Sequence, residues 1–332
     1  MRRRDAVITP LALGAATLAW TQSPGRTYRV GYLAFTDSHA PAQLRDWNAF
    51  VQRLRELGYV RGANLVIEER YARGPREYYT EMAAEMVKSK ADVVVVNSGT
   101  MARYVMGLSR TLPIVAISLP YPVQSGLVAS LARPGGQVTG VSDLSDELVP
   151  KRLELLKAAV PSIKRIAYAH CPYCDAGAGM SGTETRALQA EQEAAAHALG
   201  VTMVPANLND PNLFDGTANM LRRERVDALL IGTSRPNLMA RDEWRVFAAT
   251  QRLPTMAPYR SFGAMLSYGS DFSTLYHRAA ELVAKILGGA SPGEIPMEQP
   301  MRFEFVVNLK IARSLGLTIP PTVMLRATEV IE

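Results

Sequence analysis

The sequence has 332 residues, about twice the length of a typical domain, which predicts two lobes rather than one hydrophobic core. Hydrophobic residues make up 48% of the chain and charged residues 20%, a composition that excludes a disordered polymer. Half of the formal net charge of +6 comes from residues 1–26, and the remainder has no cluster of lysines and arginines interleaved with aromatic residues. Nucleic acid is therefore not an expected partner.

The first 26 residues predict a signal peptide. Arg2, Arg3 and Arg4 precede an apolar, alanine-rich stretch at 6–20, which is shorter than the roughly 20 residues of a membrane-spanning helix. The arginine run also fits a twin-arginine export signal. We expect a periplasmic protein whose mature chain begins after residue 20, with cleavage between Trp20 and Arg26.

Strands and helices alternate in the first half of the remaining chain. Short apolar runs rich in β-branched residues predict strands at 28–35, 65–71, 92–96, 114–118 and 138–141. Amphipathic patterns predict helices at 43–57 and 77–89.

The same alternation begins again after Ser142. Helices are expected at 146–159, 183–199, 213–223 and 239–251, and strands at 165–169, 201–205, 226–231 and 255–259. Strands joined by helices form right-handed βαβ crossovers, so the sequence predicts an α/β protein with two Rossmann-like lobes built on parallel sheets.

The C-terminal part is too short for a third domain. It contains an expected strand at 265–268, a helix at 272–287, a strand at 303–307 and a short helix ending at Leu315. We expect these elements to complete the two sheets. Lobe 1 would then comprise 27–142 and about 263–300, and lobe 2 143–262 and about 301–332. The chain would cross between the lobes near Ser142, Arg260 and Pro300, which predicts a three-stranded hinge.

Four segments carry a resemblance to a known family. They are GLVASLARPGGQVTGVS at 126–142, KRLELLK at 151–157, LSYG at 266–269 and the stretch 308–321. From Arg29 onward the chain resembles ABC-transporter substrate-binding proteins related to tryptophan- and tyrosine-binding components. The resemblance implies a type I periplasmic binding protein fold.

That resemblance also implies a function. We expect a monomeric, non-enzymatic binding protein without a cofactor, which captures a small molecule between its lobes and delivers it to an ABC permease. An amino acid or another small organic anion or zwitterion is the expected ligand. The chain departs from the family after Ser118, after Tyr168 and before Leu266, in loops where a ligand would sit, so the resemblance does not fix an amino acid as the ligand.

Candidate ligand-binding residues follow from position, because ligands of open parallel sheets lie off the carboxyl ends of the strands. Ser98, Gly99 and Thr100 end a buried strand and begin a helix, where hydroxyl and amide groups can hold an anion. Ordinary helix capping by Ser98 or Thr100 is the alternative. Equivalent positions on neighbouring strands are occupied by Thr36, Asp37, Ser118, Tyr121, His170, Tyr173, Thr233, Ser234 and Tyr259.

Further charged candidates lie beside these residues. Asp37 or Asp143 can form an ion pair with a cationic group of a ligand. For each of them, capping of the following helix is the alternative. Arg260 follows the strand expected at 255–259.

Cys171 and Cys174 are the only two cysteines, and the sequence between them has the composition of glutaredoxin-like redox sites. In an exported protein a structural disulfide is the simplest expectation. Metal binding with His170, redox catalysis and free thiols are the alternatives. A periplasmic thiol oxidoreductase is therefore one alternative function, and the ligand-sensing subunit of a receptor is another.

The glycines at 177–182 formally match a dinucleotide fingerprint. The fingerprint requires the glycines to follow the strand at once, but here 171–176 intervene. No cofactor is therefore expected. If the protein were an enzyme, these glycines would favour a nucleotide-dependent one.

Overall fold

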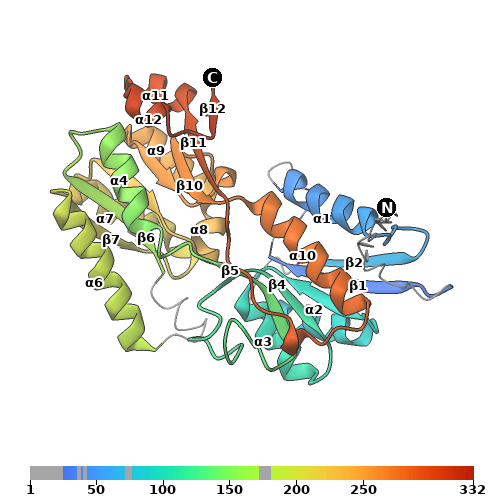
Figure 1. Ribbon diagram of the computed structural model, residues 1–332. Helices are drawn as coiled ribbons and strands as arrows, with labels where there is room; N and C mark the ends of the chain where they lie inside the picture. Colours follow the sequence, from blue (N-terminus) through green and yellow to red (C-terminus); the bar gives the residue numbers. More distant parts are fainter. Residues whose placement is uncertain (1–24, 36–38, 40–42, 72–76, 172–180) are drawn as a thin grey trace, which may run out of the picture.

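The computed structural model describes residues 25–35, 39, 43–71, 77–171 and 181–332. Figure 1 shows two lobes, each built on a sheet with helices against it, which meet near β5. The expected signal peptide and several candidate residues lie outside the described residues; the latter are Thr36, Asp37, Tyr173 and Cys174. Within the described ranges no helix is long and apolar enough to cross a membrane.

The sheet of lobe 1 has five parallel strands in the order β2-β1-β3-β4-β5. The strands are β1 (Tyr28–Ala34), β2 (Leu65–Tyr71), β3 (Val93–Val96), β4 (Ile114–Pro120) and β5 (Val138–Asp143). Four consecutive buried valines form β3, as expected for a strand covered on both faces. The helices are α1 (Leu44–Glu56), α2 (Glu77–Lys88), α3 (Gly99–Leu108) and α10 (Phe272–Leu287).

Two hydrophobic clusters form the core of lobe 1. Trp47 of α1 and Leu282 of α10 belong to the cluster on one side of the sheet. Met86 of α2 and Met101 of α3 belong to the cluster on the other side. The lobe is therefore a sheet covered by two pairs of helices, and α10 comes from the C-terminal part of the chain.

The sheet of lobe 2 has seven strands in the order β12-β11-β10-β9-β8-β6-β7. All neighbours are parallel except β10 and β11. The strands are β6 (Arg165–His170), β7 (Thr202–Asn207), β8 (Ala228–Ile231), β9 (Thr255–Ala257), β10 (Leu266–Ser270), β11 (Phe303–Asn308) and β12 (Glu329–Ile331). Two sheets of mostly parallel strands confirm the predicted fold class.

The helices of lobe 2 are α4 (Val149–Ala159), α6 (Gly182–Ala198), α7 (Phe214–Glu224), α8 (Arg235–Met239), α9 (Arg241–Gln251), α11 (Leu309–Ser314) and α12 (Pro321–Met324). Short 3₁₀ turns lie at η1 (Pro211–Leu213), η2 (Arg260–Phe262) and η3 (Pro292–Glu294). The helix expected at 239–251 is preceded by the separate turn of α8, which begins after the N-cap residue Ser234.

The expected lobe boundary near residue 263 is wrong. β10 pairs in parallel with β9 and antiparallel with β11, so it belongs to the sheet of lobe 2. The second crossing therefore lies at Asp271, between β10 and α10, and not near Arg260. The local apolar pattern indicates a strand at this point, but it does not say which sheet the strand joins.

Candidate functional site

Side chains from the carboxyl ends of β4, β5, β8 and β9 meet where the lobes join. Asp143 Oδ2 accepts hydrogen bonds from Ser118 Oγ at 2.7 Å and from the Tyr259 hydroxyl at 2.6 Å. Ser145 Oγ lies 2.6 Å from Thr233 Oγ1 and 3.0 Å from the Tyr259 hydroxyl. We call these five residues the hinge network, because Asp143 and Ser145 lie on the first segment that crosses between the lobes.

The buried guanidinium group of Arg152 is hydrogen-bonded to the hinge network. Arg152 of α4 is fully buried, and its Nη1 and Nη2 donate to the carbonyl oxygen and hydroxyl of Ser145 at 2.5 and 3.2 Å. Its Nε donates to the Tyr268 carbonyl oxygen at 2.6 Å. Burial lowers the pKa of Arg152, while the negative charge of Asp143 favours its charged form. Ser145 and Arg152 are not among the site residues predicted from the sequence.

Asp143 is a buried carboxyl group whose ionised form is partly stabilised by hydrogen bonds. Burial raises the pKa of Asp143, and hydrogen bonds from Tyr259 and Ser118 oppose that rise. Burial and the neighbouring carboxyl group of Asp143 likewise raise the pKa of the Tyr259 hydroxyl. Asp143 Oδ1 accepts no side-chain hydrogen bond from a described residue, although Asp143 is only 2% exposed, and the backbone N–H of Ser145 also stabilises the ionised carboxyl group. This oxygen can accept a hydrogen bond from a cationic group or from water.

The backbone at the end of β4 brings Ser118 toward Asp143. The pairing register between β4 and β5 shifts between Ala116 and Leu119, which marks a bulge. Ser118 has a φ of 63° and Tyr121 a φ of 48°, both in the left-handed region. Such conformations are uncommon for residues other than glycine and are enriched at binding sites.

Two predicted serines act as helix caps. Ser98 Oγ accepts a hydrogen bond from the Met101 amide at 3.2 Å, and Ser234 Oγ accepts one from the Asn237 amide at 3.3 Å. Gly99 is buried, and a Cβ there would lie 3.0 Å from methyl groups of both Leu119 and Leu127. The capping alternative is thus the role that the structure shows for Ser98, and a ligand contact of these residues and of Thr100 stays a prediction.

Other candidates lie outside the hinge network. His170 ends β6, is 6% exposed and stacks on Tyr168 with ring centroids 5.1 Å apart. Arg260 forms a bidentate ion pair with Glu329 at 2.7 and 2.8 Å. Cys171 is buried, but its expected partner lies outside the described residues, so the disulfide stays a prediction. Within the described ranges no three His, Cys, Asp or Glu side chains are grouped to hold a metal ion.

A cation from lobe 2 reaches the aromatic side chains of lobe 1. Arg235 Cζ lies 5.0 Å from the ring centroid of Tyr79 and 5.6 Å from that of Phe35. Phe35 follows β1 and Tyr79 lies in the first turn of α2. The two lobes are therefore in contact through a pair of cation–π interactions.

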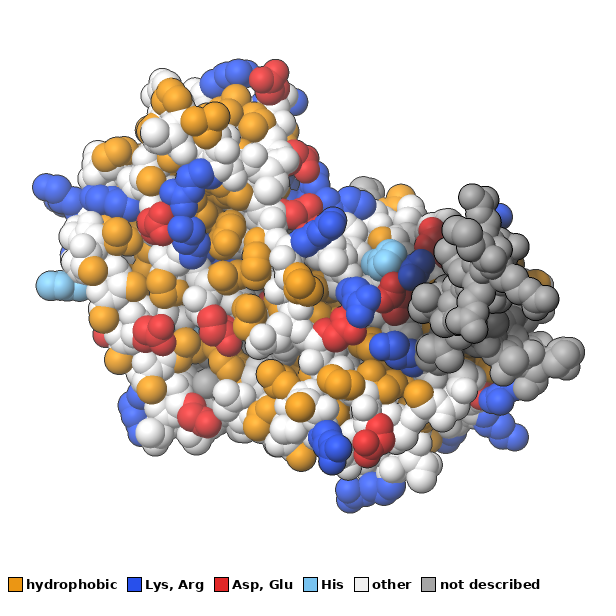
Figure 2. All heavy atoms as spheres, in the orientation of Figure 1, with side chains coloured by type: hydrophobic (Ala, Val, Ile, Leu, Met, Phe, Trp, Pro, Cys, Tyr) orange, Lys and Arg blue, Asp and Glu red, His pale blue; other side chains and the backbone are white. Residues whose placement is uncertain are grey.

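Charged side chains of both signs lie side by side where the lobes meet on the face shown in Figure 2. Arg45 of α1 binds Glu304 of β11 through Nη1 and Oε1 at 2.7 Å, and it lies 3.4 Å from Asp271. Burial raises the pKa of the adjacent Asp46 to about 6. These pairs join the lobes outside the hinge network.

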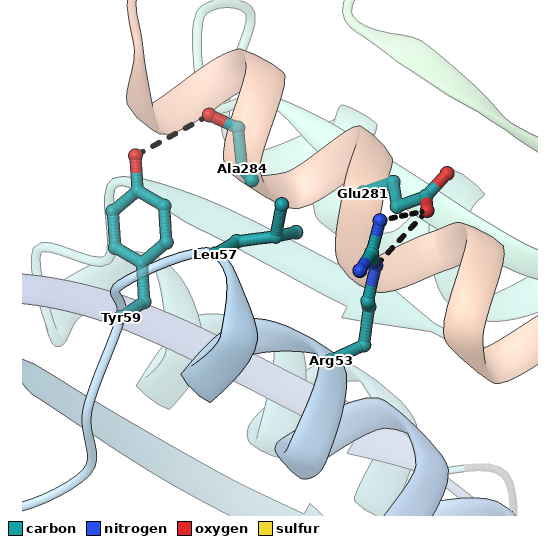
Figure 3. Close-up of a pocket in the computed structure, with 5 residues that line it drawn as sticks. All are labelled: Arg53, Leu57, Tyr59, Glu281 and Ala284. Carbon is teal, nitrogen blue, oxygen red and sulfur yellow. Dashed lines mark hydrogen bonds and ion pairs between the residues drawn. The ribbon is translucent and has the colours of Figure 1, made fainter. Parts of the chain in front are cut away.

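A separate hollow of about 220 Å³ lies between α1 and α10 on the helical face of lobe 1 (Figure 3). Arg53 Nη2 forms an ion pair with Glu281 Oε1 at 2.6 Å, and the Tyr59 hydroxyl donates to the Ala284 carbonyl oxygen at 3.4 Å. These contacts fasten α10 to α1, so the polar groups that line the hollow already have partners within the lobe.

The ABC transporter substrate binding protein family has a model that matches residues 35–331. The chain belongs to this family. The resemblance noted from the sequence and the type I periplasmic binding protein fold are thereby confirmed. Members are solute-binding components of transporters, not enzymes, and they work outside the cytoplasm.

A tyrosine-binding protein from Clostridioides difficile (strain R20291) is 24% identical over 271 residues, covering 81% of this chain and 75% of that protein. A conserved domain protein from Vibrio cholerae has a TM-score of 0.81 at 27% identity, covering 92% of this chain and all of that one. An ABC domain in complex with L-Trp from Streptococcus pneumoniae has a TM-score of 0.80 at 24% identity, with the same coverage. This family member thus has the two-lobed fold of the solved proteins over most of its length.

Proposed function

We propose that this protein captures a small organic solute between its lobes in the periplasm and delivers it to an ABC permease. The observation that carries the proposal is the hinge network, in which Ser118, Thr233 and Tyr259 from the carboxyl edges of both sheets meet through Asp143 and Ser145. Ligands of such sheets bind at this edge. A solute placed there touches both lobes and stabilises their closed arrangement.

The chemistry of this edge supports an amino acid or another small zwitterion as the solute. The first N–H groups of α3 have no partner within the helix and favour an anionic group. Two strands away, Asp143 Oδ1 offers an acceptor to an ammonium group. The names of two relatives, a tyrosine-binding protein and a complex with L-Trp, agree with this class.

Export by the signal at 1–26 and a disulfide between Cys171 and Cys174 complete the proposal. Both proposals agree with a location outside the cytoplasm, because export signals lead there and disulfides persist in oxidising compartments. Thiol counting on protein purified from periplasm, under denaturing and non-reducing conditions, tests the disulfide. Two free thiols would contradict it.

The test of the binding site begins with native mass spectrometry of protein from its own periplasm, followed by a thermal-shift screen of amino acids and organic acids. A ligand present at 100 times its dissociation constant adds about 2.7 kcal/mol to stability. Thr100→Ala and Thr233→Ala should each weaken binding of the ligand found, by about 0.5–1.5 kcal/mol for a neutral hydrogen bond or about 1.5–3 kcal/mol for a charged one.

Thr250→Ala is the matched control, because among the described residues the hydroxyl of this exposed threonine bonds within α9, to the Val246 carbonyl oxygen. Calorimetry gives the affinities and far-UV circular dichroism reports the folding of each variant. Unchanged affinity in both cleft variants would place the solute elsewhere. Loss in only one of them would mean that a single lobe holds the solute.

A further inference from the structure

Arg235 is the first residue of α8, and its guanidinium group crosses from lobe 2 to lobe 1. The guanidinium group lies over the rings of Phe35 and Tyr79. Together with Tyr104, which packs on Tyr79, they form what we call the aromatic box. Tyr79 is 3% exposed, with its ring centroid 5.4 Å from that of Phe35 and 5.9 Å from that of Tyr104. Because these rings pack on one another inside lobe 1, the box does not depend on lobe 2 for its shape.

Lobe 2 holds the backbone of Arg235 in a fixed place. Ser234 caps α8, and the fully buried Asn237 fastens the helix to the sheet. Asn237 Nδ2 donates to the Ala169 carbonyl oxygen at 2.8 Å, and Asn237 Oδ1 accepts from Trp244 Nε1 at 3.1 Å. Arg235 thus extends from a rigid support, and its contact with the box requires the two lobes to be close together.

We propose that Arg235 is a positioning residue for solute capture, which docks in the aromatic box and favours the closed arrangement of the lobes before a solute arrives. A cation–π contact gains strength when water is excluded from it, and opening of the lobes would hydrate both partners. The apparent affinity of a solute scales with the fraction of protein in the binding-competent state. This consequence for affinity rests on the proposed function, whereas the effect on lobe closure does not.

Two substitutions of Arg235 test whether its positive charge is what matters. Arg235→Gln removes the cation and keeps a side chain of similar polarity, and Arg235→Lys keeps the cation. Arg222→Gln is the matched control, because Arg222 Cζ lies 5.5 Å from the Phe247 ring centroid and both residues belong to lobe 2. A second variant, Tyr79→Leu, tests the contact from the side of lobe 1.

Small-angle X-ray scattering of the solute-free variants measures lobe closure directly. We expect a larger radius of gyration for Arg235→Gln and Tyr79→Leu than for the wild type, a value near wild type for Arg235→Lys, and no change for Arg222→Gln. Circular dichroism verifies folding. For a solute found in the screen, Arg235→Gln should raise the dissociation constant about 2- to 30-fold, and Arg235→Lys should restore most of the affinity.

A wild-type radius of gyration in folded Arg235→Gln would overturn the proposal, as would an equal expansion in Arg222→Gln. If the scattering changes as expected but no solute binds, the closing role of Arg235 stands and the proposed function fails. If a solute binds equally well to the wild type and to Arg235→Gln, the proposed function stands and the positioning role fails.

Discussion

Tyr259→Phe tests the hinge network by removing a single hydroxyl group. That hydroxyl donates to Asp143 Oδ2 at 2.6 Å and lies 3.0 Å from Ser145 Oγ. The phenylalanine ring would keep the edge-to-face contact with Phe272, whose centroid lies 4.4 Å from that of the Tyr259 ring. The expected loss is about 1.5–3 kcal/mol of unfolding free energy at a pH where Asp143 is ionised and about 0.5–1.5 kcal/mol where it is protonated, because water has little access to a residue that is 2% exposed.

The same change has a pH dependence of known sign. The pKa of Asp143 in the folded protein is raised by burial, so ionisation of this group costs stability as the pH rises from its unfolded to its folded pKa. The Tyr259 hydroxyl stabilises the ionised form and offsets part of that cost. Without the hydroxyl the pKa of Asp143 rises further. The difference in stability between wild type and Tyr259→Phe should therefore be largest at high pH and shrink as the pH falls.

Urea unfolding followed by circular dichroism, at about pH 8 and about pH 5, measures both effects. Tyr268→Phe is the control, because the Tyr268 hydroxyl forms no hydrogen bond with a described residue and its ring stacks on Phe303 with centroids 6.1 Å apart. We expect a change within about 0.5 kcal/mol for this control. An equally small change in Tyr259→Phe at both pH values would refute the role assigned to the hydroxyl.

Two further predictions concern ionisation and packing in lobe 1. Burial raises the pKa of Asp46 from 3.8 to about 6, so wild-type stability should fall by up to about 3 kcal/mol as the pH rises through that window. Thermal melts of Asp46→Asn should show a flatter pH profile, and an unchanged profile would contradict the assignment. Gly140→Ala should cost more than about 3 kcal/mol, because Gly140 has a φ of 151° and a Cβ would overlap the Ala116 carbonyl oxygen. Gly107→Ala in α3, where a Cβ would meet no atom within 4 Å, should instead be neutral or stabilising by about 1 kcal/mol in the same urea titration.

Much of the fold follows from patterns that are local in the sequence. The four valines of β3 predict a buried parallel strand, and the apolar face of α1, with Trp47, Phe50 and Leu54 buried, predicts a helix that packs on the sheet. The partner of a strand is not a local property. β10 has the apolar pattern of either sheet, and only its pairing with β9 and β11 places it in lobe 2.

The site shows the same division. Ser118, Thr233 and Tyr259 are predictable because each lies at or just after the carboxyl end of an expected strand, and the geometry of a parallel sheet brings such residues to one edge. Arg152 was missed because an arginine on a helix usually faces solvent. The sequence nonetheless indicates that Arg152 is buried, because helical spacing places it on the same face as the buried Val149 and Leu156.

The contacts among the crossing segments indicate how the proposed binding of a solute at Asp143 would act on the whole hinge. The Ser142 amide on the first segment donates to the Glu298 carbonyl oxygen on the third at 2.7 Å. The Asp271 amide on the second segment donates to the Arg302 carbonyl oxygen on the third at 3.0 Å. Because the third segment is hydrogen-bonded to both of the others, bending of one segment strains the other two. We therefore expect the lobes to close by a concerted twist, in which a contact at Asp143 reaches all three crossings.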